Sequence, residues 1–105
     1  MTTKFCRTTY INGGVCIYVL QSIKCVEIPI IVNMSEERTC ELASCYIPKF
    51  NLIVIAVYRS THKQNISEFL VILEGVLQAA YTYNPHAAIL LCGDINIDLL
   101  INNNN

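Results

Sequence analysis

The feature that most constrains this fold is a change in hydrophobic period near residue 66. Residues 52–57 are continuously apolar, which predicts a strand buried on both faces. From Ile66 the apolar residues follow the i, i+3, i+4, i+7 spacing of one helix face, namely Phe69, Leu70, Leu73, Val76, Leu77 and Ala80. Residues 87–92 are again wholly apolar and predict another buried strand, which stops at Gly93-Asp94. A strand, helix, strand order brings the last strand back parallel to one already in the sheet.

Local signals set the ends of the predicted helix. Asn65 followed three residues later by Glu68 resembles a capping box, which satisfies the first free amides of a helix. Asn84-Pro85 ends the helix, because the residue before a proline is pushed out of the helical region.

Four strands are predicted before the helix. Residues 15–20 follow Gly13-Gly14 and have the β-branched and aromatic bias of a buried strand. Residues 23–32 are a second candidate, in which Pro29 favours an edge position or a break. Residues 39–47 and 50–58, separated by Pro48-Lys49, predict an antiparallel hairpin. The expected fold is therefore α+β or α/β, with a mixed, mostly antiparallel sheet and an amphipathic helix packed on it.

Composition limits the class of protein. Hydrophobic residues make up 53% of the 105 residues and charged residues 14%, which excludes a disordered chain and predicts one domain over residues 1–105. The longest apolar run, residues 52–58, is too short for a membrane helix. No secretory signal is visible, so we expect an intracellular protein whose six cysteines are free thiols. Residues 102–105, all asparagine, predict a disordered tail.

The charge pattern gives no sign of nucleic-acid binding by itself. The net charge is −1, and all seven Lys and Arg residues lie within residues 1–63. The rest of the chain carries only acidic charges, at Glu68, Glu74, Asp94 and Asp98. Since nucleic-acid binders usually present a clustered basic face, electrostatics alone do not indicate DNA.

The candidate site is the segment Gly93-Asp94-Ile95-Asn96-Ile97-Asp98, at the carboxyl end of the last predicted strand. That end of a sheet is where α/β proteins place ligands. Asp94 and Asn96 would suit Mg²⁺, which takes oxygen ligands and often only one or two protein carboxylates. The same residue types also favour a simple turn, and this alternative stays open.

Two other kinds of metal site do not fit the sequence. An EF-hand loop is excluded, because Leu99 and Asn105 stand where it needs Gly and Glu. A zinc site at Cys40 and Cys45 lacks a second ligand pair.

An ordered set of segments resembles the endonuclease/exonuclease/phosphatase superfamily. The set comprises Gly13-Gly14-Val15-Cys16-Ile17-Tyr18-Val19, Glu41 leading into a strand, Ile55-Ala56-Val57-Tyr58-Arg59, Phe69 in the helix, and Ile89-Leu90-Leu91-Cys92-Gly93-Asp94-Ile95-Asn96-Ile97-Asp98. It is most similar to the endonuclease domain of non-LTR retrotransposons of the jockey type. The resemblance covers about residues 7–100.

This resemblance implies a fold, an activity and residue roles. The family fold is a four-layer αββα sandwich, and the activity is hydrolysis of DNA phosphodiesters with Mg²⁺ or Mn²⁺. Asp94 would orient the attacking water near the metal, Asn96 would position the water or the phosphate, and Tyr58 would contact the scissile phosphate. Arg59 is placed to approach a phosphate or to remain a solvated charge, and Asp98 fits the pattern either in the site or as a cap.

Part of the family pattern is not matched. The family's first metal ligands, an Asn and a Glu, belong upstream of Gly13-Gly14, and Asn12 and Glu27 are not in matching contexts. The Ser-Asp-His signature belongs downstream, and His62 and His86 are interpreted as surface-loop residues. We therefore expect the central part of such a domain, inactive alone and self-associating through exposed sheet edges. The alternative is a small non-enzymatic α/β interaction module.

Overall fold

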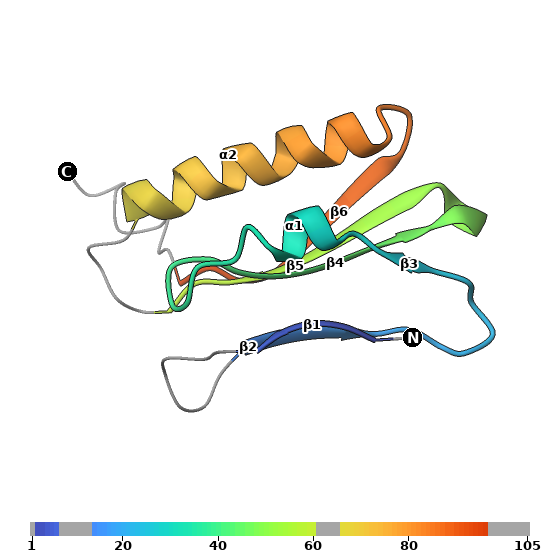
Figure 1. Ribbon diagram of the computed structural model, residues 1–105, viewed down its shortest axis with the longest axis horizontal. Coiled ribbons are helices and arrows are strands. Elements are labelled where there is room, and N and C mark those ends of the chain that lie inside the picture. Colours follow the sequence, from blue (N-terminus) through green and yellow to red (C-terminus); the bar gives the residue numbers. More distant parts are fainter. Residues whose placement is uncertain (1, 7–13, 61–65, 97–105) are drawn as a thin grey trace, which may run out of the picture.

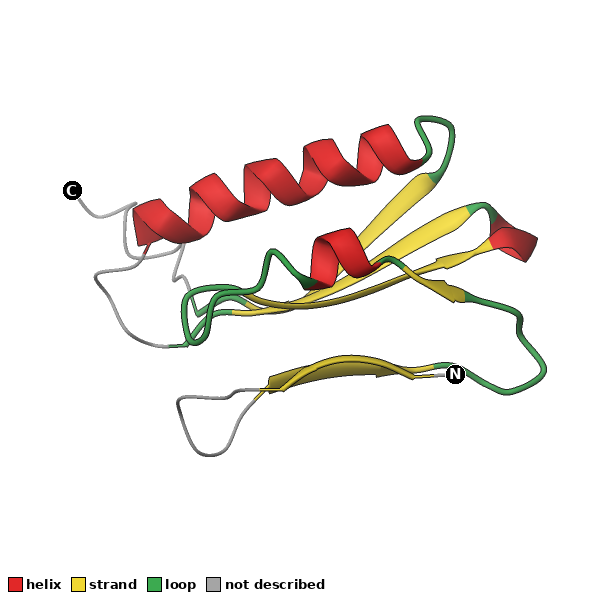
Figure 2. Ribbon diagram, in the orientation of Figure 1, coloured by secondary structure: helices red, strands yellow, loops and turns green. Residues whose placement is uncertain are grey.

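A computed structural model describes residues 2–6, 14–60 and 66–96 of the chain. The elements in these ranges are β1 (Thr2–Cys6), β2 (Gly14–Tyr18), β3 (Val26–Glu27), α1 (Pro29–Val32), β4 (Glu41–Ile47), the 3-10 helix η1 (Pro48–Phe50), β5 (Leu52–Tyr58), α2 (Ile66–Tyr83) and β6 (Ala88–Asp94) (Figure 1). They form three layers: the two α-helices, a four-stranded sheet, and the β1–β2 pair on the other side of that sheet (Figure 2).

The four-stranded sheet has the order β3-β4-β5-β6. β3 and β4 are antiparallel, as are β4 and β5, whereas β5 and β6 are parallel. The hairpin between β4 and β5 turns through η1 and Asn51, which has the left-handed φ of 47°. The predictions of a mixed, mostly antiparallel sheet, of this hairpin and of a parallel strand reached through a helix are thus confirmed.

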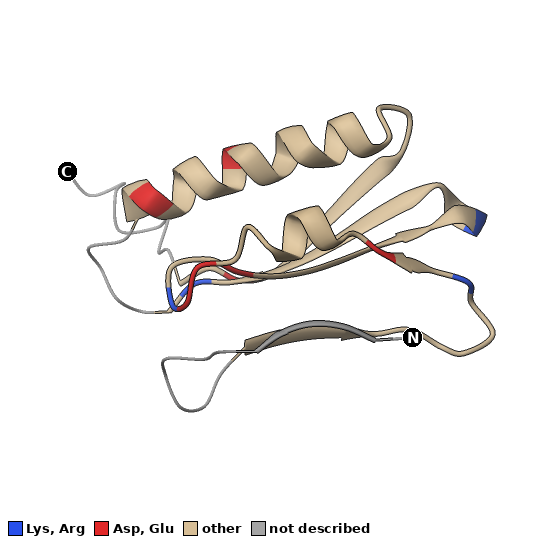
Figure 3. Cartoon of the chain, in the orientation of Figure 1, with Lys and Arg blue, Asp and Glu red and all other residues tan. Residues whose placement is uncertain are grey.

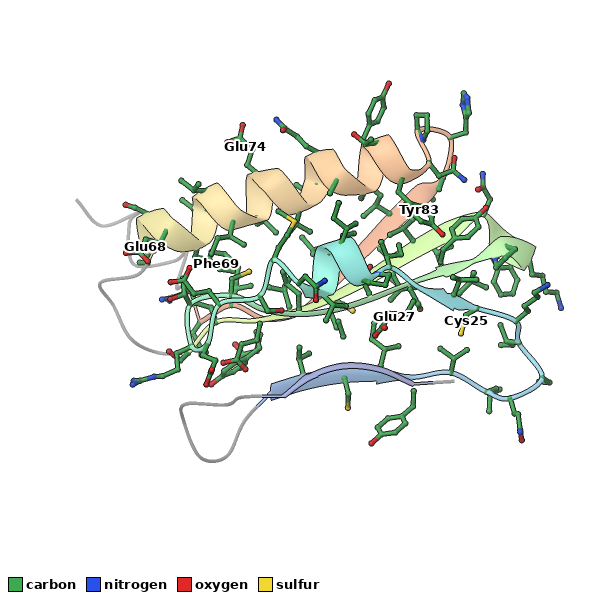
Figure 4. All side chains as sticks on the ribbon, in the orientation of Figure 1. Cys25, Glu27, Glu68, Phe69, Glu74 and Tyr83 are labelled. Atoms are coloured by element: carbon green, nitrogen blue, oxygen red, sulfur yellow. The ribbon has the colours of Figure 1, made fainter. Side chains whose placement is uncertain are left out.

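The main core lies between α2 and the sheet. Phe69, Val76 and Ala80 of α2 are buried against the sheet, on which Leu42, Ile53, Ile55 and Val57 are buried on the same side. Phe69 points from α2 toward the sheet, whereas Glu74 points away from it (Figure 4). The helix ends at Tyr83, directly before Asn84-Pro85, as predicted; Asn65, the predicted cap, lies outside the described residues.

The strand predicted over residues 23–32 is only partly right: the edge position and the break at Pro29 are confirmed, but the strand is much shorter than predicted. Only Val26–Glu27 is a strand, and Pro29 begins the short helix α1. Proline suits this position because its fixed φ is helical and its missing N–H would have no partner in a first turn. The helix instead carries Ile31 into the core, where its side chain is fully buried.

Two further differences concern the N-terminal hairpin. β1 was not predicted, and it pairs antiparallel with β2 from Thr2 opposite Tyr18 to Cys6 opposite Gly14. The buried strand predicted over residues 15–20 is instead β2, ending at Tyr18, and Val15 and Ile17 are half-buried while Cys16 and Tyr18 are exposed. The alternation arises because, in the part of the chain described, only one face of this pair is covered.

The expected burial of the last strand is also wrong. Every residue of β6 is exposed, and Ile89, Leu90 and Leu91 keep 40%, 49% and 40% of their surface. β6 pairs with β5 along one edge and is the outermost strand of the described sheet. A run of apolar residues predicts that a strand is buried, but it does not show how many other elements pack against that strand.

In the described ranges, no helix is long and apolar enough to span a bilayer.

Two buried thiols predict a loss of stability at high pH. Burial raises the pKa of Cys40 to about 12 and that of Cys45 to about 11, with Glu36 raising the first further and Cys25 the second. The unfolded thiols ionise near pH 8.5. The free energy of unfolding should therefore be insensitive to these thiols below about pH 8.5 and fall from there to about pH 11, by up to about 1.4 kcal/mol per pH unit for each thiol.

Urea titrations over this pH range measure the effect. Cys40→Ala should flatten the decline, whereas Cys16→Ala, at an exposed position, should leave it unchanged. Equal slopes in the two variants would contradict the assignment of the decline to the buried thiol.

Candidate functional site

The candidate site lies where β5 and β6 end side by side. Tyr58, the last residue of β5, stands opposite Asp94, the last residue of β6. On its other side Tyr58 stands opposite Glu41, the first residue of β4. Residues opposite each other on neighbouring strands share a face, so these three side chains form one row across the sheet. The next positions, Leu42 and Val57, belong to the core under α2, so the row faces the opposite side, which is the side of β1–β2.

Asp94 and Asn96 form a tight turn. The Asp94 Oδ1 accepts a hydrogen bond from the Asn96 backbone N–H at 3.1 Å, which is an Asx turn. Asn96 has a left-handed φ of 53°, and Gly93 before the turn has a φ of 139°. The turn that the composition favoured is therefore present. It leaves the Asp94 side chain exposed at the end of β6.

Arg59 holds this turn against the end of β5. Its side chain is 2% exposed, and its Nε donates to the Ile95 carbonyl at 2.7 Å and its Nη2 to the Asn96 carbonyl at 2.6 Å. The Arg59 backbone N–H donates to the Asp94 carbonyl at 2.9 Å, and its carbonyl accepts from the Asn96 Nδ2 at 2.5 Å. The solvated-charge interpretation of Arg59 is therefore wrong, because the side chain is buried. These two contacts of its guanidinium are to backbone carbonyls of the turn.

A third loop joins the same end of the sheet. Arg38, with a left-handed φ of 67°, donates its backbone N–H to the Glu41 Oε2 at 2.6 Å. Its carbonyl accepts from the Ser60 N–H at 2.9 Å. Glu41 is fully buried. In the sequence, Glu41 is part of the resemblance, which assigns it no role. Its local signal is a carboxylate three residues after Arg38, at the start of a strand.

Of the two histidines, His86 is described by the structure and lies away from this site. His86 is exposed in the turn between α2 and β6, at the opposite end of the strands from Asp94. His62 and Asp98 lie outside the described residues. Among residues 2–6, 14–60 and 66–96, no group of three or more His, Cys, Asp or Glu residues is placed to hold a metal ion.

The donor set fits Mg²⁺ through few protein ligands. Asp94 offers an exposed carboxylate, one oxygen of which accepts a hydrogen bond within the turn. The Asn96 side chain donates through its Nδ2, and its Oδ1 is the oxygen that a metal or a water could use. One carboxylate with one amide oxygen is within the range for Mg²⁺, which keeps waters and substrate phosphate as its other ligands.

Charges do not gather into a basic face in the described part of the chain. Lys24 lies before β3 and Lys49 in η1, whereas Arg38 and Arg59 lie near each other at the candidate-site end of the sheet, where Asp and Glu residues lie beside them (Figure 3). Comparison with family models, curated proteins and solved structures finds no match to this chain.

Proposed function

We propose that this chain is the central part of a metal-dependent phosphodiesterase domain, a DNA endonuclease of retrotransposon origin. The observation that most supports the proposal is the meeting of Tyr58, Asp94 and Asn96 at the ends of two adjacent parallel strands. These are the residues to which the resemblance assigns the chemistry, and they come from segments about 36 residues apart in the sequence.

The layers of the fold support the same proposal. The β1–β2 pair lies on the side of the sheet away from α2, as a second sheet would in an αββα sandwich. Tyr18 on β2 is exposed, which is expected where further strands and a helix layer belong. We infer that the complete domain covers this side of β2.

The proposed chemistry divides between the metal and the chain. A bound Mg²⁺ or Mn²⁺ would neutralise the charge that develops on the phosphoryl oxygens. The Asp94 carboxylate would orient the attacking water, and the Tyr58 hydroxyl would donate to a non-bridging phosphate oxygen. Asn96 would hold the water or the phosphate through its amide. The substrate is DNA, bound through its backbone rather than through a basic face of this part of the domain.

We expect the isolated chain not to cleave DNA. Its described residues bring one exposed carboxylate to the site, and residues matching the family's other metal ligands and its catalytic histidine are not found. Incubation of supercoiled plasmid with the protein and Mg²⁺ should give no nicked product above the no-protein control. Robust nicking that Asp94→Ala abolishes would contradict this expectation.

Metal binding tests the site itself. Calorimetric titration with Mn²⁺ should show weak binding to the native chain and none to Asp94→Asn, which removes the charge but keeps an oxygen that can accept from the Asn96 N–H. Glu74→Gln is the matched control, because it removes an exposed carboxylate on the outer side of α2. Equal binding by the native chain and Asp94→Asn would exclude the proposed site and leave only a turn.

The exposed apolar edge of β6 also favours a second candidate, a small non-enzymatic interaction module. In that case Asp94 serves only the turn, and metal binding does not depend on it. The surrounding genomic sequence separates the two candidates without any protein. Upstream Asn and Glu motifs, a downstream Ser-Asp-His and a reverse transcriptase are expected for the endonuclease, and none of these for the module.

A further inference from the structure

Exposed apolar side chains lie on two neighbouring elements, α2 and β6. We call the surface they form the α2–β6 surface, and define it by the exposed side chains of Ile66, Leu70, Leu77, Tyr81, Ile89 and Leu91. The first four belong to α2 and the last two to β6. Monomeric proteins seldom expose a large contiguous apolar patch to solvent, so we expect another molecule to cover this surface.

Helix geometry places these α2 residues on the β6 side. Gly75 marks the opposite flank of α2, because a Cβ there would lie 2.9 Å from the Met34 Cε in the loop after α1. At 3.6 residues per turn, Leu70, Leu77 and Tyr81 lie roughly 120–160° around the helix from Gly75. α1 packs over β4, and β6 is at the other end of the described sheet order. The flank away from α1 is therefore the flank above β6.

β6 lacks the features that usually protect an edge strand. Residues 88–92 contain no charge, no proline and no polar side chain except the Cys92 thiol. Edge strands of stable monomers are usually interrupted by lysines, prolines or bulges, since their outward N–H and C=O groups otherwise pair with another chain. In the part of the chain that the structure describes, no strand pairs with the outer edge of β6.

We propose that a second copy of this chain occupies the α2–β6 surface. The two β6 strands pair antiparallel about a two-fold axis through Leu91, and the two α2 helices lie beside each other on the same face of the joined sheet. A two-fold axis perpendicular to the sheet keeps both helix layers on one side, so one operation covers both parts of the surface. The inference is independent of metal binding or nuclease activity.

The register about Leu91 suits the side chains of β6. Leu91 meets Leu91 of the second copy, and Ile89 meets Gly93 of the second copy, which leaves room for the larger side chain. Asp94 meets Ala88 of the second copy, so the two carboxylates lie at opposite ends of the joined strands. Like charges directly opposite would destabilise such a pair, and this register avoids them.

The size of the surface is adequate for a stable dimer. An 18-residue helix is about 27 Å long and a seven-residue strand about 23 Å, and the two run along the same side of the molecule. Stable dimers bury about 800 Å² on each partner, with an apolar centre and a polar rim. Six large apolar side chains supply the centre, and Glu74 of α2, which lines a shallow groove with Leu77 and Tyr81, supplies part of the rim.

Sedimentation velocity over a range of protein concentrations tests the proposal. We expect the native chain to be a dimer, and Leu91→Lys to weaken dimerisation at least tenfold, because it sets two lysines opposite each other across the axis. Val71→Lys is the matched control: Val71 is 70% exposed on α2, away from the α2–β6 surface, and its variant should dimerise like the native chain. A native chain that stays monomeric, or equal weakening by both variants, would overturn the proposal.

A cross-link provides a second test that does not depend on how well Leu91→Lys folds. In a chain whose exposed Cys16 and Cys92 are replaced by serine, Leu91→Cys should form a covalent dimer under mild oxidation, because residues facing each other across the axis are within disulfide reach. Val71→Cys should give at most a small fraction of that product. The proposal would also be overturned if the chain formed assemblies of no fixed size and Leu91→Cys gave no more cross-linked product than Val71→Cys.

Discussion

Gly93→Ala is expected to destabilise the fold by about 4 kcal/mol or more. A Cβ at this position would lie 1.8 Å from the Val57 carbonyl oxygen and 2.9 Å from the Val57 nitrogen, both in the backbone of the neighbouring strand. Gly93 also has a φ of 139°, which side-chain-bearing residues rarely adopt and which alone costs about 1–3 kcal/mol. Because the obstacle is backbone, no rotamer change relieves it, and β5 and β6 must separate near Tyr58 and Asp94. Urea unfolding followed by circular dichroism measures the loss.

Gly75→Ala is the matched control for this substitution. The atom that its Cβ would approach is the Cε of Met34, at 2.9 Å, which is the end of a flexible side chain. Alanine in a helix interior is favoured over glycine by about 1 kcal/mol, which offsets the adjustment of Met34. Gly75→Ala should therefore unfold within about 1 kcal/mol of the native chain. If both glycine variants lost the same stability, the close approach of β6 to Val57 would be contradicted.

The strand, helix and strand of the C-terminal half could be predicted from sequence because each signal there is local. The spacing of Phe69, Val76 and Ala80 defines the face of α2, and Pro85 defines its end. Pro29 shows the opposite case. Its ring disfavours the middle of a strand and favours the start of a helix, and only the burial of Ile31 against the sheet decides between the two. The packing of Ile31 against the sheet joins segments that are distant in sequence, so it produces no periodic pattern within residues 23–32.

The candidate site divides in the same way. Asp94 and Asn96 could be identified because the residues of a turn after a strand are contiguous in sequence. The contacts of Arg59 with this turn could not, since they are made to the backbone carbonyls of Ile95 and Asn96, which every residue type possesses. The position of Glu41 beside Tyr58 could not be predicted either, because it depends on the register of β4 and β5. The exposure of β6 follows from its position in the strand order, which its own apolar residues do not reveal.

Arg59→Met is the other substitution with a large expected effect. It keeps a long side chain but removes the donors to the Ile95 and Asn96 carbonyls, which lie on the turn that carries Asp94. Removing the donor leaves these carbonyls without their hydrogen bonds, which costs about 1–3 kcal/mol for each. Lys49→Met is the control: Lys49 is an exposed cation near the Phe50 ring, and its loss should change stability by less than about 1 kcal/mol.

Hydrogen exchange shows whether Arg59 acts on the turn or only on the fold as a whole. The Asn96 amide donates to Asp94 within the turn, whereas Val57 lies in the buried part of β5. Well below the melting temperature, Arg59→Met should speed exchange at the Asn96 amide while the amides of β5 stay protected, and Arg59→Lys, which keeps the charge and can restore one donor, should fall between the two. Equal acceleration at Asn96 and in β5 would mean that Arg59 supports the sheet generally. Selective acceleration would make it the residue that positions Asp94, because the turn is then the first structure to open when the guanidinium is lost.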